Sequence, residues 1–113
     1  MTYEEPLPIT QGDAQTALVS NSIDQATEAL IRVALHEPDR NWAESFCMTG
    51  LRDSRIEVRS AAITGLGHLA RRFRTVGAVA VLALQSLMTD PVLAGLVDDA
   101  LDDILVFANR PHS

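Results

Sequence analysis

The chain has 113 residues, of which 47% are hydrophobic and only 4% aromatic, and its formal net charge is −6. This length predicts a single domain, and so few aromatic residues favour packed helices over a β-sandwich. The negative charge argues against the phosphate contacts of a nucleic-acid-binding protein and against adsorption to an anionic membrane. It favours a protein partner with a basic surface.

Cysteine content and the N-terminal sequence narrow the class of protein further. The single cysteine, Cys47, excludes an internal disulfide and a cysteine-based zinc site. Residues 1–10 lack the basic start and apolar run of a secretory signal, and the nearly uncharged stretch 76–88 is too short to span a bilayer. We therefore expect a cytoplasmic protein.

The N-terminal part predicts a leader followed by two helices. Residues 1–8 contain two prolines and predict an extended, partly mobile leader. A start signal predicts a short helix over residues 10–19. Ser22 and Gln25 then have the spacing of a capping box, which predicts an amphipathic helix that Pro38 must terminate.

The middle of the chain predicts a second pair of helices. A start signal at Asn41 precedes the third helix, and a capping box of Ser54 and Glu57 predicts a fourth helix that begins near Ile56. Glycine inside a helix costs about 1 kcal/mol relative to alanine. We therefore expect a neighbouring helix to approach the fourth helix closely at small residues such as Gly65.

The C-terminal part predicts a third pair. Residues 79–88 form a helix that is apolar on nearly every side, so we expect it to be largely buried or covered by a partner. Asp90 as cap and Pro91 in the first turn predict a final helix that runs to about Ala108. One domain over residues 9–109 and a loose tail over 110–113 complete the prediction.

The stretch 51–73, LRDSRIEVRSAAITGLGHLARRF, carries a resemblance to a known family. Its leucine, Asp-containing turn, Val-Arg, small pair and Leu-Gly-x-Leu-Ala are similar to a HEAT-like (armadillo-type) helical repeat. The resemblance covers about a fifth of the chain and implies an all-α fold of three stacked antiparallel hairpins, an α-solenoid. It also implies that Asp53 and Arg59 help to tie adjacent hairpins together.

The predicted last helix carries two rows of carboxylates at i,i+4 spacing, Asp98 with Asp102 and Asp99 with Asp103. Like charges at this spacing destabilise a helix by a few tenths of a kcal/mol. The rows are either a solvated acidic face near the start of a helix, or a docking site for arginines and lysines of a partner. A Mg²⁺ or Ca²⁺ site is a third alternative, but it needs further ligands that the sequence does not place nearby.

Stacked hairpins would present the second helix of each pair on one face, which is a common binding surface in solenoids. The candidate partner-binding residues on that face are Asp24, Glu28, Thr64, His68, Arg71, Asp98, Asp99, Asp102 and Asp103. Trp42 is a further candidate, either as an anchor for a partner or as a residue that fills the gap between the first two hairpins.

No catalytic constellation emerges from the sequence. It contains no nucleophile with an identifiable base, no glycine-rich phosphate loop and no metal motif, so we expect no catalysis, cofactor or metal. His36 and Glu37 form a single metal-capable pair, and a helix-end histidine that interacts with the helix dipole is the default interpretation.

Residues 67–71 and 100–104 extend the resemblance to function. Small acidic HEAT-like bacterial proteins with such second and last helices look like immunity proteins encoded beside polymorphic or contact-dependent toxins. The resemblance implies a protein that neutralises a cognate toxin, such as a basic nuclease-type domain, by covering it. Two alternatives stay open: a small metal-dependent or lyase-like helical-repeat enzyme, and a homo-oligomeric scaffold subunit with helix 79–88 as its interface.

Overall fold

The computed structural model describes residues 6–107, and this part of the chain contains six α-helices and no strand. The helices are α1 (Gln11–Leu18), α2 (Ile23–His36), α3 (Arg40–Leu51), α4 (Ile56–Phe73), α5 (Ala78–Ser86) and α6 (Ala94–Phe107). The all-α prediction is therefore confirmed for these residues. The predicted tail and Ala108 lie outside them, as do residues 1–5 of the predicted leader.

Side-chain oxygens cap the first three helices. The hydroxyls of Thr10 and Ser22 each accept a hydrogen bond from the backbone N–H three residues on, as the sequence predicts. The third helix begins earlier than predicted. The carboxylate of Asp39 accepts from the backbone N–H of Trp42 at 3.0 Å, so α3 starts at Arg40 rather than after Asn41.

The capping box predicted at Ser54 and Glu57 is wrong, although α4 does begin at Ile56. The N-cap position is Arg55, and no side chain caps it. Instead, the carboxylate of Asp53 accepts from the backbone N–H of Arg55 at 2.9 Å. Asp53 thus makes the side-chain hydrogen bond in this turn, and the Ser54 hydroxyl does not cap α4.

Arg55 also joins the first two helix pairs, a role that the HEAT-like resemblance assigned to Arg59. Its guanidinium donates to the carbonyl oxygens of Leu18 and Ser20, each at 2.8 Å, and to the carboxylate of Asp53. This contact holds the pKa of Asp53 below its ordinary value. Arg59 instead donates within its own turn, to the backbone oxygens of residues 53 and 54.

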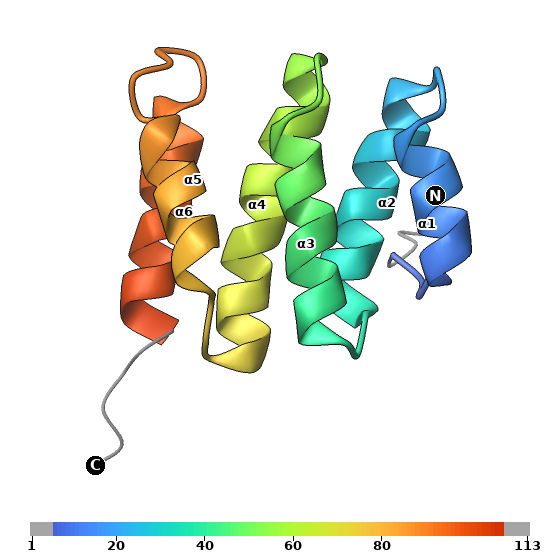
Figure 1. Ribbon diagram of the computed structural model, residues 1–113, viewed down its shortest axis with the longest axis horizontal. Coiled ribbons are helices and arrows are strands. Elements are labelled where there is room, and N and C mark those ends of the chain that lie inside the picture. Colours follow the sequence, from blue (N-terminus) through green and yellow to red (C-terminus); the bar gives the residue numbers. More distant parts are fainter. Residues whose placement is uncertain (1–5, 108–113) are drawn as a thin grey trace, which may run out of the picture.

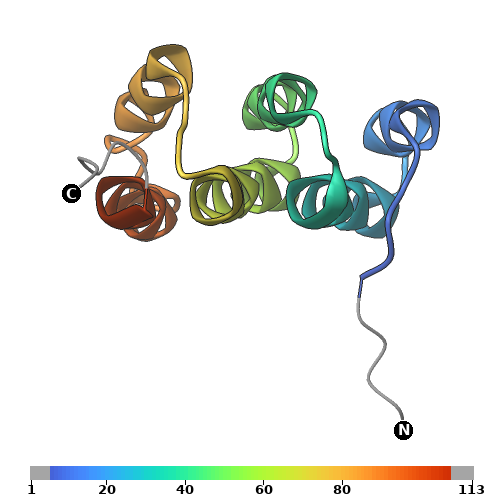
Figure 2. The same ribbon diagram turned by 90° about the horizontal axis from the view of Figure 1, so that it is seen from below.

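The helices lie in two rows (Figure 2). One row contains α2, α4 and α6, and the other contains α1, α3 and α5. The connections α1–α2, α3–α4 and α5–α6 lie at one end of the molecule, and α2–α3 and α4–α5 lie at the other, so successive helices run in opposite directions (Figure 1). This packing is compatible with the predicted three-hairpin HEAT-like solenoid, which stays a prediction.

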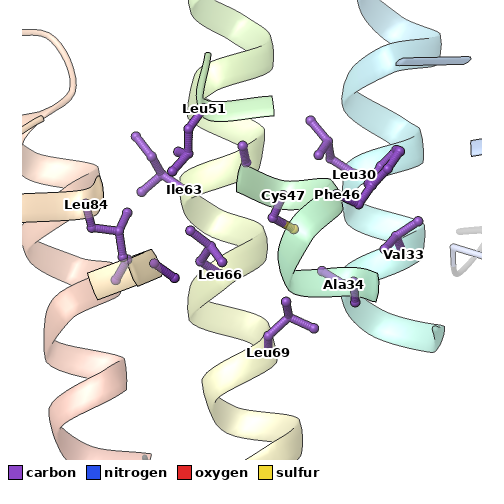
Figure 3. Close-up of a cluster of buried hydrophobic side chains, with 14 of the residues drawn as sticks. Leu30, Val33, Ala34, Phe46, Cys47, Leu51, Ile63, Leu66, Leu69 and Leu84 are labelled. Atoms are coloured by element: carbon purple, nitrogen blue, oxygen red, sulfur yellow. The ribbon is translucent and has the colours of Figure 1, made fainter. Parts of the chain in front are cut away.

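The core lies along α4, which packs against α2, α3 and α6. Fully buried aliphatic side chains such as Leu30, Ile63 and Leu66 fill the space between the rows (Figure 3). The predicted close approach occurs at Gly65, where a Cβ atom would lie 2.9 Å from Sγ of Cys47 and 3.4 Å from Cβ of Ala34. Packing against α2 and α3 thus offsets the cost of glycine in this helix.

Two expectations for the C-terminal pair are corrected. α5 buries only Ala80 and Leu84, while Val79 and Leu82 are 66% and 64% exposed, so the helix is not largely buried. Its predicted role as an interface stays a prediction. Asp90 caps a turn over residues 91–93 through the backbone N–H of Val92, and α6 begins only after that turn. No helix among residues 6–107 has the length and hydrophobicity needed to cross a membrane.

Candidate functional site

The α2–α4–α6 row places several of the predicted binding residues around one shallow groove between α4 and α6. The groove has a volume of about 240 Å³. Its lining includes five of the predicted residues: Thr64, His68, Arg71, Asp99 and Asp103. Asp98 and Asp102 lie on the same helix and are exposed, but they do not line the groove. Residues distant in sequence therefore meet here because α4 and α6 are neighbours.

Small residues make the groove possible. A Cβ atom at Gly67 would lie 3.1 Å from a carboxylate oxygen of Asp103 and 3.8 Å from Cβ of Ala100. The absence of a side chain at this position lets α6 approach α4 until polar side chains of both helices border one space. Leu96, Gly67 and Ala100 are lining residues that the sequence analysis did not single out as a site. Leu96 and Ala100 are four residues apart, and so are Asp99 and Asp103, so the two pairs lie on adjacent faces of α6. This spacing is the sequence signal that could have identified Leu96 and Ala100 as lining residues.

The carboxylates of α6 differ in their electrostatic surroundings. Arg71 donates to both oxygens of Asp103, at 3.0 and 3.1 Å, across the α4–α6 contact. The guanidinium also lies 5.8 Å from the centre of the Phe107 ring. None of the ion pairs formed within residues 6–107 involves Asp98, Asp99 or Asp102. Among the aspartates of α6, only Asp103 therefore has an ion-pair partner within residues 6–107.

His68 lies between these charges and is half-buried. Burial lowers the pKa of its imidazole below the ordinary value, Arg71 lowers it further, and Asp103 opposes the shift. The ring is therefore neutral at neutral pH and carries one donor and one acceptor nitrogen. The groove thus combines hydrogen-bonding groups with a single guanidinium and two carboxylates.

The face of α2 is partly occupied by residues that precede α1. Arg32 donates to the carbonyl oxygens of Leu7 and Pro8, each at 2.8 Å, and Nε2 of His36 lies 2.6 Å from the carbonyl oxygen of Pro6. The segment passes beside α2 in Figure 2. Carbonyl oxygens of residues 6–8, the described part of the predicted leader, thus contact side chains of α2, and the mobility of the leader stays a prediction.

Three other residues considered in the sequence, Asp24, Glu28 and His36, do not line the groove. Asp24 and Glu28 are exposed on α2. His36 lies in the last turn of α2, the helix-end position of the default interpretation, and its Nε2 also contacts the carbonyl oxygen of Pro6. The part of the chain that the structure describes contains no group of three or more His, Cys, Asp or Glu side chains placed to hold a metal ion.

Trp42 lies in the other row, on α3. Its ring stacks on Phe46 with centroids 5.0 Å apart and planes 13° from parallel. Together they line a second groove, of about 320 Å³, between α1 and α3. This position fits the gap-filling interpretation, and it separates Trp42 from the aspartates of α6. A role for Trp42 as a partner anchor stays a prediction.

Comparison with known proteins adds a relative with the same fold. A chain in the crystal structure of a CDI complex from Cupriavidus taiwanensis LMG 19424 is 34% identical to this one. The match covers 95% of this chain and 97% of the other, with a TM-score of 0.82. The chain belongs to the same family as this CDI-complex component. No protein-family model and no curated protein matched the sequence. Because this match covers nearly all of both chains, the relative shares the helical fold of this chain.

Proposed function

We propose that this protein is a non-catalytic immunity protein of a CDI system, which binds a cognate toxin and neutralises it by covering it. CDI systems pair a toxin with an immunity protein. The observation that carries the proposal is the 34% identity to a component of a CDI complex over 97% of that component. That relative is part of a complex, which supports binding of another protein and agrees with the immunity-protein resemblance of residues 67–71 and 100–104.

Charge supports the immunity role over the toxin role. The chain carries a net charge of −6, and three exposed aspartates of α6 have no ion pair within residues 6–107. An acidic inhibitor suits a toxin with a basic surface, such as a nuclease-type domain, because complementary fields accelerate encounter and disfavour wrong partners.

The chemistry of the thiol supports a non-catalytic role. Cys47 is the only cysteine and is fully buried between α3 and α4. Burial, with a smaller contribution from Glu44, raises the pKa of its thiol to about 12. The thiolate is the nucleophilic form of cysteine, so this side chain is unreactive at neutral pH. It serves instead as a small apolar group against Gly65.

Co-expression with the cognate toxin domain tests the proposal. The wild-type chain should restore growth to cells that produce the toxin. The triple variant Asp98→Lys, Asp99→Lys and Asp102→Lys should lose this protection, because it reverses the exposed carboxylates but spares the Arg71–Asp103 pair. Asp13→Lys, which reverses an exposed aspartate on α1 in the other row, is the control and should protect like wild type. Failure of the wild-type chain to protect would contradict the proposed function.

A further inference from the structure

We propose that the groove between α4 and α6 is a subsite for one arginine side chain of the partner protein, anchored by Asp99. The proposal rests on the proposed function, because the arginine belongs to the bound toxin. It goes further in naming one groove and one anchoring carboxylate out of the acidic surface of α6.

The charges that border the groove select a cation. Asp99 and Asp103 are its two carboxylates, and Arg71 is the only cationic side chain among the described residues that line it. Arg71 already contacts both oxygens of Asp103, so within residues 6–107 Asp99 is the lining carboxylate without an ion pair. His68 adds no positive charge at neutral pH because its pKa is lowered. Asp98 and Asp102 lie nearby on α6 and increase the negative potential without lining the groove.

The volume of the groove limits the occupant to about one side chain. Pockets for drug-sized ligands have volumes of about 300–1,000 Å³. The 240 Å³ of this groove is smaller, and several of its lining residues, among them Thr64, Arg71 and Asp99, are exposed. A single side chain that projects from a partner fits this space better than a free small molecule does.

The lining favours arginine as that side chain. Leu96 and Ala100 provide apolar contacts for an aliphatic stem, while the Asp99 carboxylate, the Thr64 hydroxyl and the neutral His68 ring provide acceptors. A guanidinium presents five N–H donors in a planar arrangement and can serve several acceptors at once. The same surface is less accessible on α2, where residues 6–8 are hydrogen-bonded to Arg32 and His36.

Titration of the full chain with N-acetyl-L-arginine amide, followed by NMR, tests this subsite without the toxin. Saturable shifts are expected at Thr64, Gly67 and His68, and N-acetyl-L-citrulline amide, the neutral isostere, should not produce them. Asp99→Asn should weaken the binding by about tenfold or more, the expected effect of losing a charge-assisted hydrogen bond. Asp98→Asn is the matched control on the same helix, and its affinity should stay within about twofold of wild type.

The outcomes separate the subsite from the proposed function. Equal shifts with the citrulline derivative, equal losses in the Asp98 and Asp99 variants, or shifts confined to the α1–α3 groove would each overturn the subsite. If any of these occurs while the wild-type chain still protects cells from the toxin, the immunity role stands and the toxin uses other contacts. Binding of the arginine derivative by a chain that gives no protection would contradict the immunity role alone.

Discussion

At the scale of single residues, Arg55 is a side chain that connects the start of α4 to the backbone near the end of α1. It contacts the carbonyl oxygens of Leu18 and Ser20 near the end of α1 and the carboxylate of Asp53 after α3. Carbonyl groups at the ends of helices have no intrahelical partner, so a guanidinium that serves two of them satisfies backbone groups as well as a charge.

The comparison of Arg55→Met with Arg59→Met tests this role. Methionine keeps most of the aliphatic stem, so the change removes mainly the guanidinium. We expect Arg55→Met to lower the melting temperature by about 5 °C, because it leaves the Asp53 carboxylate and two carbonyl oxygens without their partner. Arg59→Met should have a smaller effect, because Arg59 contacts only its own turn. Thermal unfolding followed by circular dichroism would measure both, and an equal or reversed order would contradict the assignment.

The choice between these two arginines also shows what sequence can predict about residues. The HEAT-like resemblance placed Asp53 in the turn before α4, where its carboxylate accepts from the backbone N–H of Arg55. The pairing partner depends on where the α1–α2 loop lies relative to α4, which is a tertiary distance. A sequence pattern therefore does not distinguish the roles of Arg55 and Arg59, whereas the folded chain gives them different partners.

At the scale of helices, α5 depends on a side chain from α3 for its N-terminal anchor. The backbone N–H of Gly77, at the N-cap position of α5, donates to Oε1 of Glu44 at 2.9 Å. The other oxygen of Glu44 pairs with Arg40 at 3.0 Å. A carboxylate near a helix N-terminus is favoured by the helix dipole. Because α5 buries only Ala80 and Leu84 within its length, this contact is a large part of what fixes its position.

Glu44→Ala should therefore loosen α5 more than the rest of the protein. We expect the free energy of unfolding to fall by about 1–2 kcal/mol, the usual cost of removing a helix cap or a buried hydrogen bond. Amide hydrogen exchange should accelerate in α5 before it does in α2 or α4. Glu57→Ala, at an exposed glutamate in the first turn of α4, is the control and should change stability by no more than a few tenths of a kcal/mol. Uniform acceleration across all helices would contradict the local role of Glu44.

The existence of the helices follows from the sequence more securely than their boundaries or burial. Amphipathic helices such as α2 and α4 show the three- and four-residue spacing that their buried faces require. α5 lacks this periodicity because it is apolar on all sides, so its exposed face could not be distinguished from its buried one. The structure places it at the end of a row, where a neighbour is present on one side only.

At the scale of the whole molecule, two rows of helices decide which candidate residues act together. Thr64, His68 and Asp99 were predicted on one face, and the structure brings them to one groove. The pairing of Arg71 with Asp103 could not be predicted, because it depends on how the helix pairs pack. A close helix approach was predicted at the small residues of α4, and the structure shows that α6 is the neighbour at Gly67.

The proposed function requires that this acidic chain captures a toxin through the α2–α4–α6 row. The most direct test is the association rate of the purified wild-type chain with the cognate toxin domain, measured at low and at physiological ionic strength. A net charge of −6 and three aspartates of α6 that form no ion pair within residues 6–107 predict rapid binding that slows markedly as salt screens the charges. No detectable complex, or an association rate that does not change with salt, would contradict the account.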